Sequence, residues 1–200
     1  GVNKANIYPP LGIAYIAGVL EKNGYKCKII DANILEMRNE DVLKIIKDYN
    51  PDVVCISINI TTAIAGNSLS REIKNRFNKK VIIGGVHAST VTERTLKSSL
   101  ADAIILGESE ETVLEFVKKD CNPKGVLGLA YIENGKTIFT GKRPLIKNLN
   151  NLPYIPYHLL PKLKLYKTRY RKKPTASILT SRGCTYHCIF CGSGAKDSIF

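Results

Sequence analysis

The sequence lacks a long apolar run. No stretch of its 200 residues approaches the roughly 20 apolar residues that are needed to span a bilayer. The first residues, from Gly1 to Lys4, also lack the apolar core of a signal peptide. We therefore expect a cytoplasmic protein without a membrane span, in which the cysteines do not form a disulfide framework.

Acidic residues are scarce beside basic ones. There are 17 Asp and Glu against 30 Lys and Arg, which gives a formal net charge of +13. One stretch without any acidic residue holds eight of the basic ones: Lys162, Lys164, Lys167, Arg169, Arg171, Lys172, Lys173 and Arg182. Such an excess suits a nucleic-acid partner, but a solvated connecting segment explains it more simply. A nucleic-acid partner is therefore allowed but not favoured.

Short apolar runs alternate with helical periods over residues 1–125, the pattern of βα units. Strands are expected at residues 25–30, 52–57, 80–84 and 102–106. Helices are expected at residues 11–22, 40–49, 63–77, 89–99 and 110–119. This order predicts an α/β fold with an open, doubly wound parallel sheet and right-handed crossovers. Its first strand is missing, because the residues before the first helix are polar.

The pattern changes after the sheet. Two alternating segments, 128–132 and 136–140, flank Asn134-Gly135, a strong signal for a hairpin turn. Residues 144–174 predict a connection, and residues 175–179 predict a new strand. We divide the chain into an α/β domain (1–125), a hairpin with a basic linker (126–174) and a strand with a cysteine loop (175–200).

Three of the six cysteines lie within eight residues, with the spacing Cys-x3-Cys-x2-Cys: Cys184, Cys188 and Cys191. Thiolates this close can bind one centre, and soft sulfur ligands select zinc, copper(I) or iron–sulfur clusters. Three cysteines leave one iron of a four-iron cluster without a protein ligand. Zinc would need a fourth ligand, such as His187.

This loop resembles the signature of radical SAM enzymes, including the aromatic Phe190 before the last cysteine. The resemblance implies that Cys184, Cys188 and Cys191 bind a 4Fe-4S cluster. The open iron of such a cluster binds S-adenosylmethionine, which is cleaved by one electron to a 5′-deoxyadenosyl radical. The strand expected at residues 175–179 would then begin the barrel of this family.

Four polar or glycine-rich segments lie at or just after expected strand ends, or lead into the first helix: residues 9–12, 57–62, 84–88 and 107–111. Ligands of doubly wound sheets bind at the carboxyl ends of the strands. Together the segments resemble the flavodoxin-like cobalamin-binding domain of one branch of radical SAM enzymes. The resemblance implies a cobalamin site formed by Ser57, Thr61, Thr62, Gly84 and Gly85, with Pro10, Leu11, Gly12 and Glu108 near the corrin face.

The sequence departs from many cobalamin domains in one motif. The Asp-x-His-x-x-Gly segment that supplies a lower cobalt ligand is absent, and Asp31-Ala32-Asn33 holds no histidine. We interpret His87 as a loop histidine that bonds backbone, and Glu110 and Glu111 as acidic residues that favour a helix dipole. Glu108 stays a candidate for the pocket.

These features predict the N-terminal part of a cobalamin-dependent radical SAM enzyme. Its full-length form is expected to carry out methyl transfer, cyclisation or related radical chemistry on a small molecule, with an electron donor. Because a complete (β/α)8 barrel takes about 250 residues, we expect these 200 residues to be inactive alone.

Two alternatives stay open. The first is a tRNA-modifying radical SAM enzyme with a second cluster on Cys27, Cys55 and Cys121, although the first two are expected mid-strand as small buried residues and the third as a loop thiol. The second is a non-enzymatic module that binds cobalamin, or that binds zinc through the cysteine loop and His187.

Overall fold

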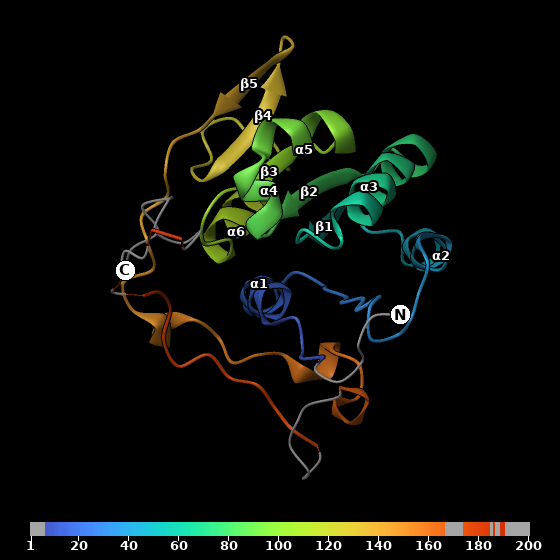
Figure 1. Cartoon of the computed structure of the whole chain (residues 1–200), viewed down its shortest axis with the longest axis vertical. Helices are drawn as coiled ribbons and strands as arrows, with labels where there is room; N and C mark the ends of the chain where they lie inside the picture. Colours follow the sequence, from blue (N-terminus) through green and yellow to red (C-terminus); the bar gives the residue numbers. More distant parts are fainter. Residues whose placement is uncertain (1–6, 167–173, 185, 187–188, 191–200) are drawn as a thin grey trace.

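The computed structural model describes residues 7–166, 174–184, 186 and 189–190. In this part of the chain, five strands form one sheet in the order β1-β2-β3-β4-β5 (Figure 1). The strands are β1 (Val53–Ser57), β2 (Lys80–Gly84), β3 (Ala103–Ile105), β4 (Leu129–Glu133) and β5 (Lys136–Phe139). The helices are α1 (Leu11–Lys22), α2 (Asn39–Tyr49), α3 (Ala63–Phe77), α4 (Val86–Thr90), α5 (Thr92–Ser99) and α6 (Glu110–Lys118).

The centre of the sheet is parallel. Val81, Ile82 and Ile83 of β2 are fully buried between the neighbours β1 and β3, as expected for an unbroken apolar run. Asp102, which directly precedes β3, is hydrogen-bonded to β2, because its Oδ2 accepts from the Val81 amide at 2.8 Å. The expected strands 52–57, 80–84 and 102–106 are therefore confirmed within one residue at each end.

Helices cover both faces of the sheet. On one face, α2, α3 and α5 contribute Leu43, Ile73 and Leu96 to the first core cluster. On the other face, α1 and α6 contribute Ile16 and Phe116 to the second. The doubly wound α/β fold is thus confirmed.

The hairpin is part of the sheet. Strand β4 pairs antiparallel with β3, and β5 pairs antiparallel with β4. The turn holds Asn134 and Gly135 at φ of 50° and 74°, as this pair of residues predicts. The sheet is therefore mixed, whereas the sequence predicted only parallel strands and a separate hairpin.

Two predicted strands are absent from the described residues. Residues 25–30 are extended and bury Ile29, but no described segment pairs with them, and no strand precedes α1 from residue 7 onward. Residues 175–179 also lack a described partner, and Ile178 is 73% exposed. A strand is stabilised by its ladder of hydrogen bonds, so alternation without a neighbour does not produce one.

The prediction of one helix over residues 89–99 is also wrong in detail, because this segment is divided between the two helices α4 and α5. Val91 separates α4 from α5 with φ −120° and ψ 52°. The Thr92 hydroxyl donates to the carbonyls of Ala88 and Ser89, each at 3.1 Å. Such side-chain bonds compete with the helical ladder and favour a break.

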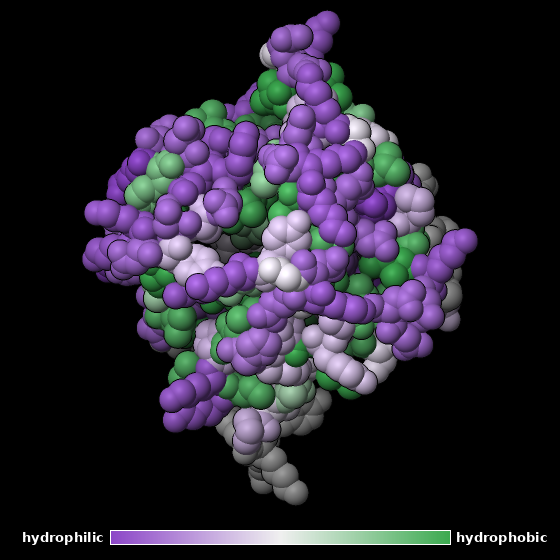
Figure 2. All heavy atoms as spheres, turned by 180° about the vertical axis from the view of Figure 1, so that it is seen from behind, coloured by the Kyte–Doolittle hydropathy of each residue, from purple (hydrophilic) through white to green (hydrophobic). Residues whose placement is uncertain are grey.

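The linker folds back on the domain. Its single-turn 3₁₀ helices, Leu149–Asn151, Tyr157–Leu159 and Leu163–Leu165, run past α1, in orange in Figure 1. A small core there joins Ala14 and Ala17 of α1 to Leu160. No helix in the described ranges is long and apolar enough to cross a membrane. From behind, hydrophilic side chains dominate the surface, with apolar patches between them (Figure 2).

Candidate functional site at the carboxyl edge of the sheet

The ends of β1 and β2 bring two predicted site residues together. Ser57 and Gly84 are partners in the parallel register, and the amide of Ile58 donates to the Gly84 carbonyl at 2.9 Å. Gly85 follows with φ 103°, a conformation that L side chains rarely adopt. A β-carbon at Gly85 would lie 2.3 Å from the Ile58 oxygen. Only glycine lets these two loops approach so closely.

The loop after β1 is held by an asparagine turn. The side-chain oxygen of Asn59 accepts from the Thr61 amide at 2.9 Å, the Thr61 hydroxyl at 2.7 Å and the Thr62 amide at 3.1 Å. The Thr62 hydroxyl accepts from the Asn59 amide at 3.0 Å. The predicted threonines are exposed, and they also shape the loop that begins α3. Asn59 was not among the site residues predicted from the sequence.

Three large apolar side chains are exposed at this edge. Ile60 is 74%, Ile64 88% and Val86 80% exposed, and they come from the loop after β1, from α3 and from α4. Exposed apolar groups gathered at strand ends favour binding of a large, partly apolar ligand. Sequence reasoning missed these side chains as site residues, because an apolar residue is ordinarily expected to be buried.

A cleft of about 370 Å³ lies at the ends of α1 and β3. It brings together the predicted residues Leu11, Gly12 and Glu108. Pro10 precedes α1, and its carbonyl accepts from the Ala14 amide at 3.1 Å, which fixes the first turn beside the cleft. The remaining wall is formed by Tyr15, Gly107, Ser109, Glu110, Leu179, Ser181, Arg182 and Gly183.

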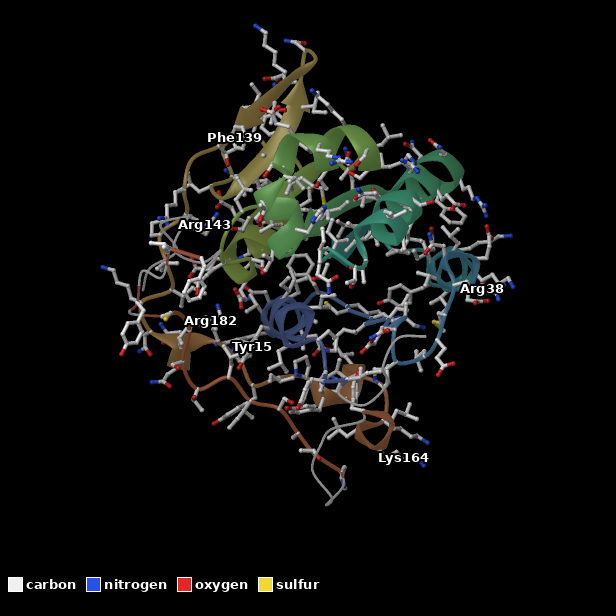
Figure 3. The ribbon with its side chains drawn as sticks, viewed as in Figure 1. Tyr15, Arg38, Phe139, Arg143, Lys164 and Arg182 are labelled. Carbon is white, nitrogen blue, oxygen red and sulfur yellow. The ribbon has the colours of Figure 1, made fainter. Side chains whose placement is uncertain are left out.

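Arg182 is the central charged residue of this cleft. Its Nη1 donates to Glu108 Oε1 at 2.9 Å, and its Nη2 donates to Glu110. The guanidinium carbon lies 5.3 Å from the centroid of the Tyr15 ring, a cation–π geometry (Figure 3). Burial lowers the pKa of Arg182, but the hydrogen bonds to Glu110 and Glu108 outweigh it and raise this pKa overall. Arg182 therefore stays charged.

Both oxygens of Glu108 are engaged. The second oxygen accepts from the amide of Ile146 at 2.7 Å, so this carboxylate joins the linker to the arginine. Glu110 is 3% exposed, and its Oε2 has no hydrogen-bond partner among the described residues. Glu111 is exposed and lies 3.9 Å from Arg143. Thus Glu110, predicted to serve the helix dipole, also carries an ion pair that the sequence analysis missed.

The cysteine loop is described in part. Cys184 is exposed and lies two residues after Arg182, whereas Cys188, Cys191 and His187 are outside the described residues. Within the described part, no three Cys, His, Asp or Glu side chains group closely enough to hold a metal ion. The predicted cluster ligands therefore remain a prediction from the spacing.

The other three cysteines lie in one core cluster. Burial raises the pKa of all three thiols, Cys27, Cys55 and Cys121. The pKa of Cys55 reaches about 12, because the neighbouring Cys121 and Cys27 raise it further by a smaller amount. Cys121, predicted as a loop thiol, follows α6 but is buried. Thiols held neutral in an apolar core are poor metal ligands. This environment counts against a second cluster at these positions.

Comparison with known proteins identifies the upstream region. The family model of the B12 binding domain matches residues 1–117. The chain is 36% identical to an uncharacterized methyltransferase, PH0819, of Pyrococcus horikoshii, over 94% of this chain and 41% of that protein. It is 29% identical to the anaerobic magnesium-protoporphyrin IX monomethyl ester cyclase of Rubrivivax gelatinosus, over 96% of this chain and 36% of that protein. The chain thus spans less than half the length of these relatives.

Two solved structures share the fold. The radical S-adenosylmethionine methyltransferase TsrM from Kitasatospora setae superposes with a TM-score of 0.60 at 14% identity, over 69% of this chain and 29% of that one. The second is the cobalamin-dependent S-adenosylmethionine radical enzyme OxsB with aqua-cobalamin and S-adenosylmethionine bound. It superposes with a TM-score of 0.62 at 18% identity, over 69% of this chain and 20% of that one. At these identities the likeness establishes the architecture alone.

Proposed function

Because the chain belongs to the family of B12-binding domains, we propose that it is the cobalamin-binding N-terminal part of a radical SAM enzyme. The observation that carries this proposal is the carboxyl edge of the sheet, where glycine backbone and exposed apolar side chains lie together. Gly85 leaves no room for a side chain, and Ile64 and Val86 are more than three-quarters exposed. A bulky ligand that covers these groups removes apolar surface from water.

The residues of this edge fit cobalamin. Ser57, Thr61 and Thr62 offer hydroxyls, and Gly84 and Gly85 offer backbone without side chains, for the nucleotide tail. Leu11 and Gly12 line the cleft beside α1, with Pro10 directly before them, and we assign these to the corrin side. Glu108 braces the wall of that cleft through Arg182 and Ile146.

The cysteine loop completes the proposal. Cys184, Cys188 and Cys191 would bind a 4Fe-4S cluster with S-adenosylmethionine at its open iron. Bound together, these cofactors supply radical formation and a carrier for a methyl group. For the full-length protein we propose methyl transfer, cyclisation or related radical chemistry in the cytoplasm, with a small-molecule substrate and an electron donor. The curated relatives include both a methyltransferase and a cyclase by name, which supports this range.

The test is cofactor content of the full-length protein, purified without oxygen and reconstituted with iron, sulfide and cobalamin. We expect about one cobalamin and four iron per chain after desalting, and cleavage of S-adenosylmethionine on reduction. The variant Cys184→Ala should lose iron but keep cobalamin, whereas Cys27→Ala should keep both. A protein that retains neither cobalamin nor iron, or that holds zinc instead, would overturn the proposal.

A further inference from the structure

Arg182 anchors the segment that leads into the cysteine loop. Within residues 178–184 it is the one residue that is not exposed. Its side chain is 21% exposed, and those of its partners Glu108 and Glu110 are 17% and 4% exposed. Upstream, the hydroxyl of Tyr157 donates to the carbonyl of Ser177, five residues earlier. Among the described residues 178–184, the guanidinium of Arg182 is therefore the group that ties the chain to the edge of the sheet.

The anchor points are themselves fixed. Glu108 lies three residues after the end of β3, Glu110 is the first residue of α6, and Tyr15 lies on α1. Ile146 holds the second oxygen of Glu108. A guanidinium that donates through two different nitrogens to two carboxylates has a defined orientation, unlike a point charge. The contact therefore holds the backbone at Gly183 and Cys184 in a fixed position relative to the edge of the sheet.

This arrangement is more than a surface ion pair. Glu108 and Glu110 place two carboxylates beside one arginine, so removal of the arginine would leave two partly buried negative charges facing each other. Exposed pairs contribute little to stability, but pairs that are largely desolvated fix one geometry. The same cleft holds Leu11 and Gly12, the residues assigned to the corrin side.

We propose that Arg182 is a positioning residue that, through Glu108 and Glu110, holds the backbone at Cys184, the first residue of the cysteine loop, at one fixed place beside the cleft that Leu11 and Gly12 line. This inference rests on the proposed function, since it concerns the separation between the cluster and cobalamin. In this role Arg182 acts through the backbone that carries Cys184.

The first measurement needs no cofactor. Limited proteolysis of the full-length apoprotein with chymotrypsin, followed by mass spectrometry, is compared for wild type, Arg182→Met, Arg182→Lys and Arg143→Met. Arg143 is the matched control, because its side chain is even less exposed, at 13%, and bonds Thr112 and Glu115 of the same helix α6. We expect Arg182→Met to be cleaved about tenfold faster after Leu179, which is 44% exposed, Arg182→Lys to fall between, and Arg143→Met to be cleaved there as the wild type is.

The second measurement reports the separation of the two cofactors. In the loaded protein, reduced to the paramagnetic cluster and cob(II)alamin, wild type should give one narrow dipolar coupling by electron paramagnetic resonance. Arg182→Met should keep its iron and cobalamin but broaden or lose that coupling, and Arg182→Lys should restore part of it. Unchanged cleavage after Leu179 or an unchanged coupling in Arg182→Met overturns the inference while the proposed function stands. A wild type that binds no cobalamin overturns the proposed function instead.

Discussion

Gly85 and Ile58 lie so close that no other residue fits at position 85. A β-carbon there would meet the Ile58 carbonyl oxygen at 2.3 Å and its nitrogen at 3.1 Å. Both contacts are with backbone, which cannot rotate away as a side chain would. The two loops at the carboxyl edge of the sheet can therefore approach this closely because residue 85 carries a hydrogen in place of a side chain.

We expect Gly85→Ala to destabilise the protein and to abolish cobalamin retention. The substitution combines a positive φ with a backbone collision, which together cost about 2–4 kcal/mol of the free energy of unfolding. Urea denaturation measures this loss, and absorbance after desalting measures cobalamin. Gly24→Ala is the control, because Gly24 has φ 83° but open space around it. It should cost about 1 kcal/mol and keep cobalamin bound; equal effects of the two variants would contradict the role of the close approach.

The exposed side chains at the same edge should matter for binding and not for stability. Ile64→Asp is expected to leave the melting temperature unchanged, because Ile64 is 88% exposed. Burial of such a side chain under cobalamin contributes roughly 1.5–3 kcal/mol, so the Kd should rise at least about tenfold. Titration of cobalamin into the apoprotein measures this. Ile132→Asp, an exposed residue of the hairpin, should bind as the wild type does.

Local patterns predicted most elements but not their long-range pairing. The apolar stripe of α1 and the buried run of β2 gave these elements their observed bounds, because periodicity is written in neighbouring residues. The pairing of β3 with β4 depends on contacts between distant segments, so the hairpin's place in the sheet was missed. Residues 25–30 show the reverse error, since alternation was present but a described partner strand was not.

The candidate site divides in the same way. Membership in the cobalamin-binding family was predicted from short segments at strand ends, and the family match confirms it. Arg182 was counted only as one of the basic residues, because its partner Glu110 lies 72 positions away. Distance along the chain hides such a pair, and only the fold brings its members together. The sequence did contain a signal for this pair: an arginine two residues before the first cysteine of the loop, and acidic residues just after an upstream strand.

The partly buried thiol of Cys55 should make stability fall at high pH. Burial raises its pKa from 9.0 to about 12, so the folded state favours the neutral thiol. This contribution is complete below the unfolded pKa and is lost as the pH rises from about 9 towards 12. We expect Cys55→Ala to show a shallower decline of the free energy of unfolding across this range than the wild type, measured by urea denaturation. Cys184→Ala, which removes an exposed thiol, should decline as the wild type does.

A larger residue at Gly18 should displace the linker. A β-carbon there would lie 3.2 Å from Pro153 and 3.3 Å from Pro156. Gly18→Leu is thus expected to open residues 149–166 to protease, whereas Gly12→Leu should not, because nothing lies within 4 Å of a β-carbon at Gly12. Limited proteolysis with mass spectrometry identifies the cleavage sites. Protection of the linker in Gly18→Leu would contradict the observed packing.

The return of the linker to α1 also has a consequence for synthesis on the ribosome. Glu21 of α1 meets His158, which follows it by 137 positions. At a translation rate of about 5–20 residues per second, the apolar face around Ala14 and Ala17 waits on the order of ten seconds for its cover. During that interval the nascent chain presents a helix with an unshielded side. We expect crosslinking of ribosome-bound chains that end near Thr140 to detect contacts between this face of α1 and chaperones.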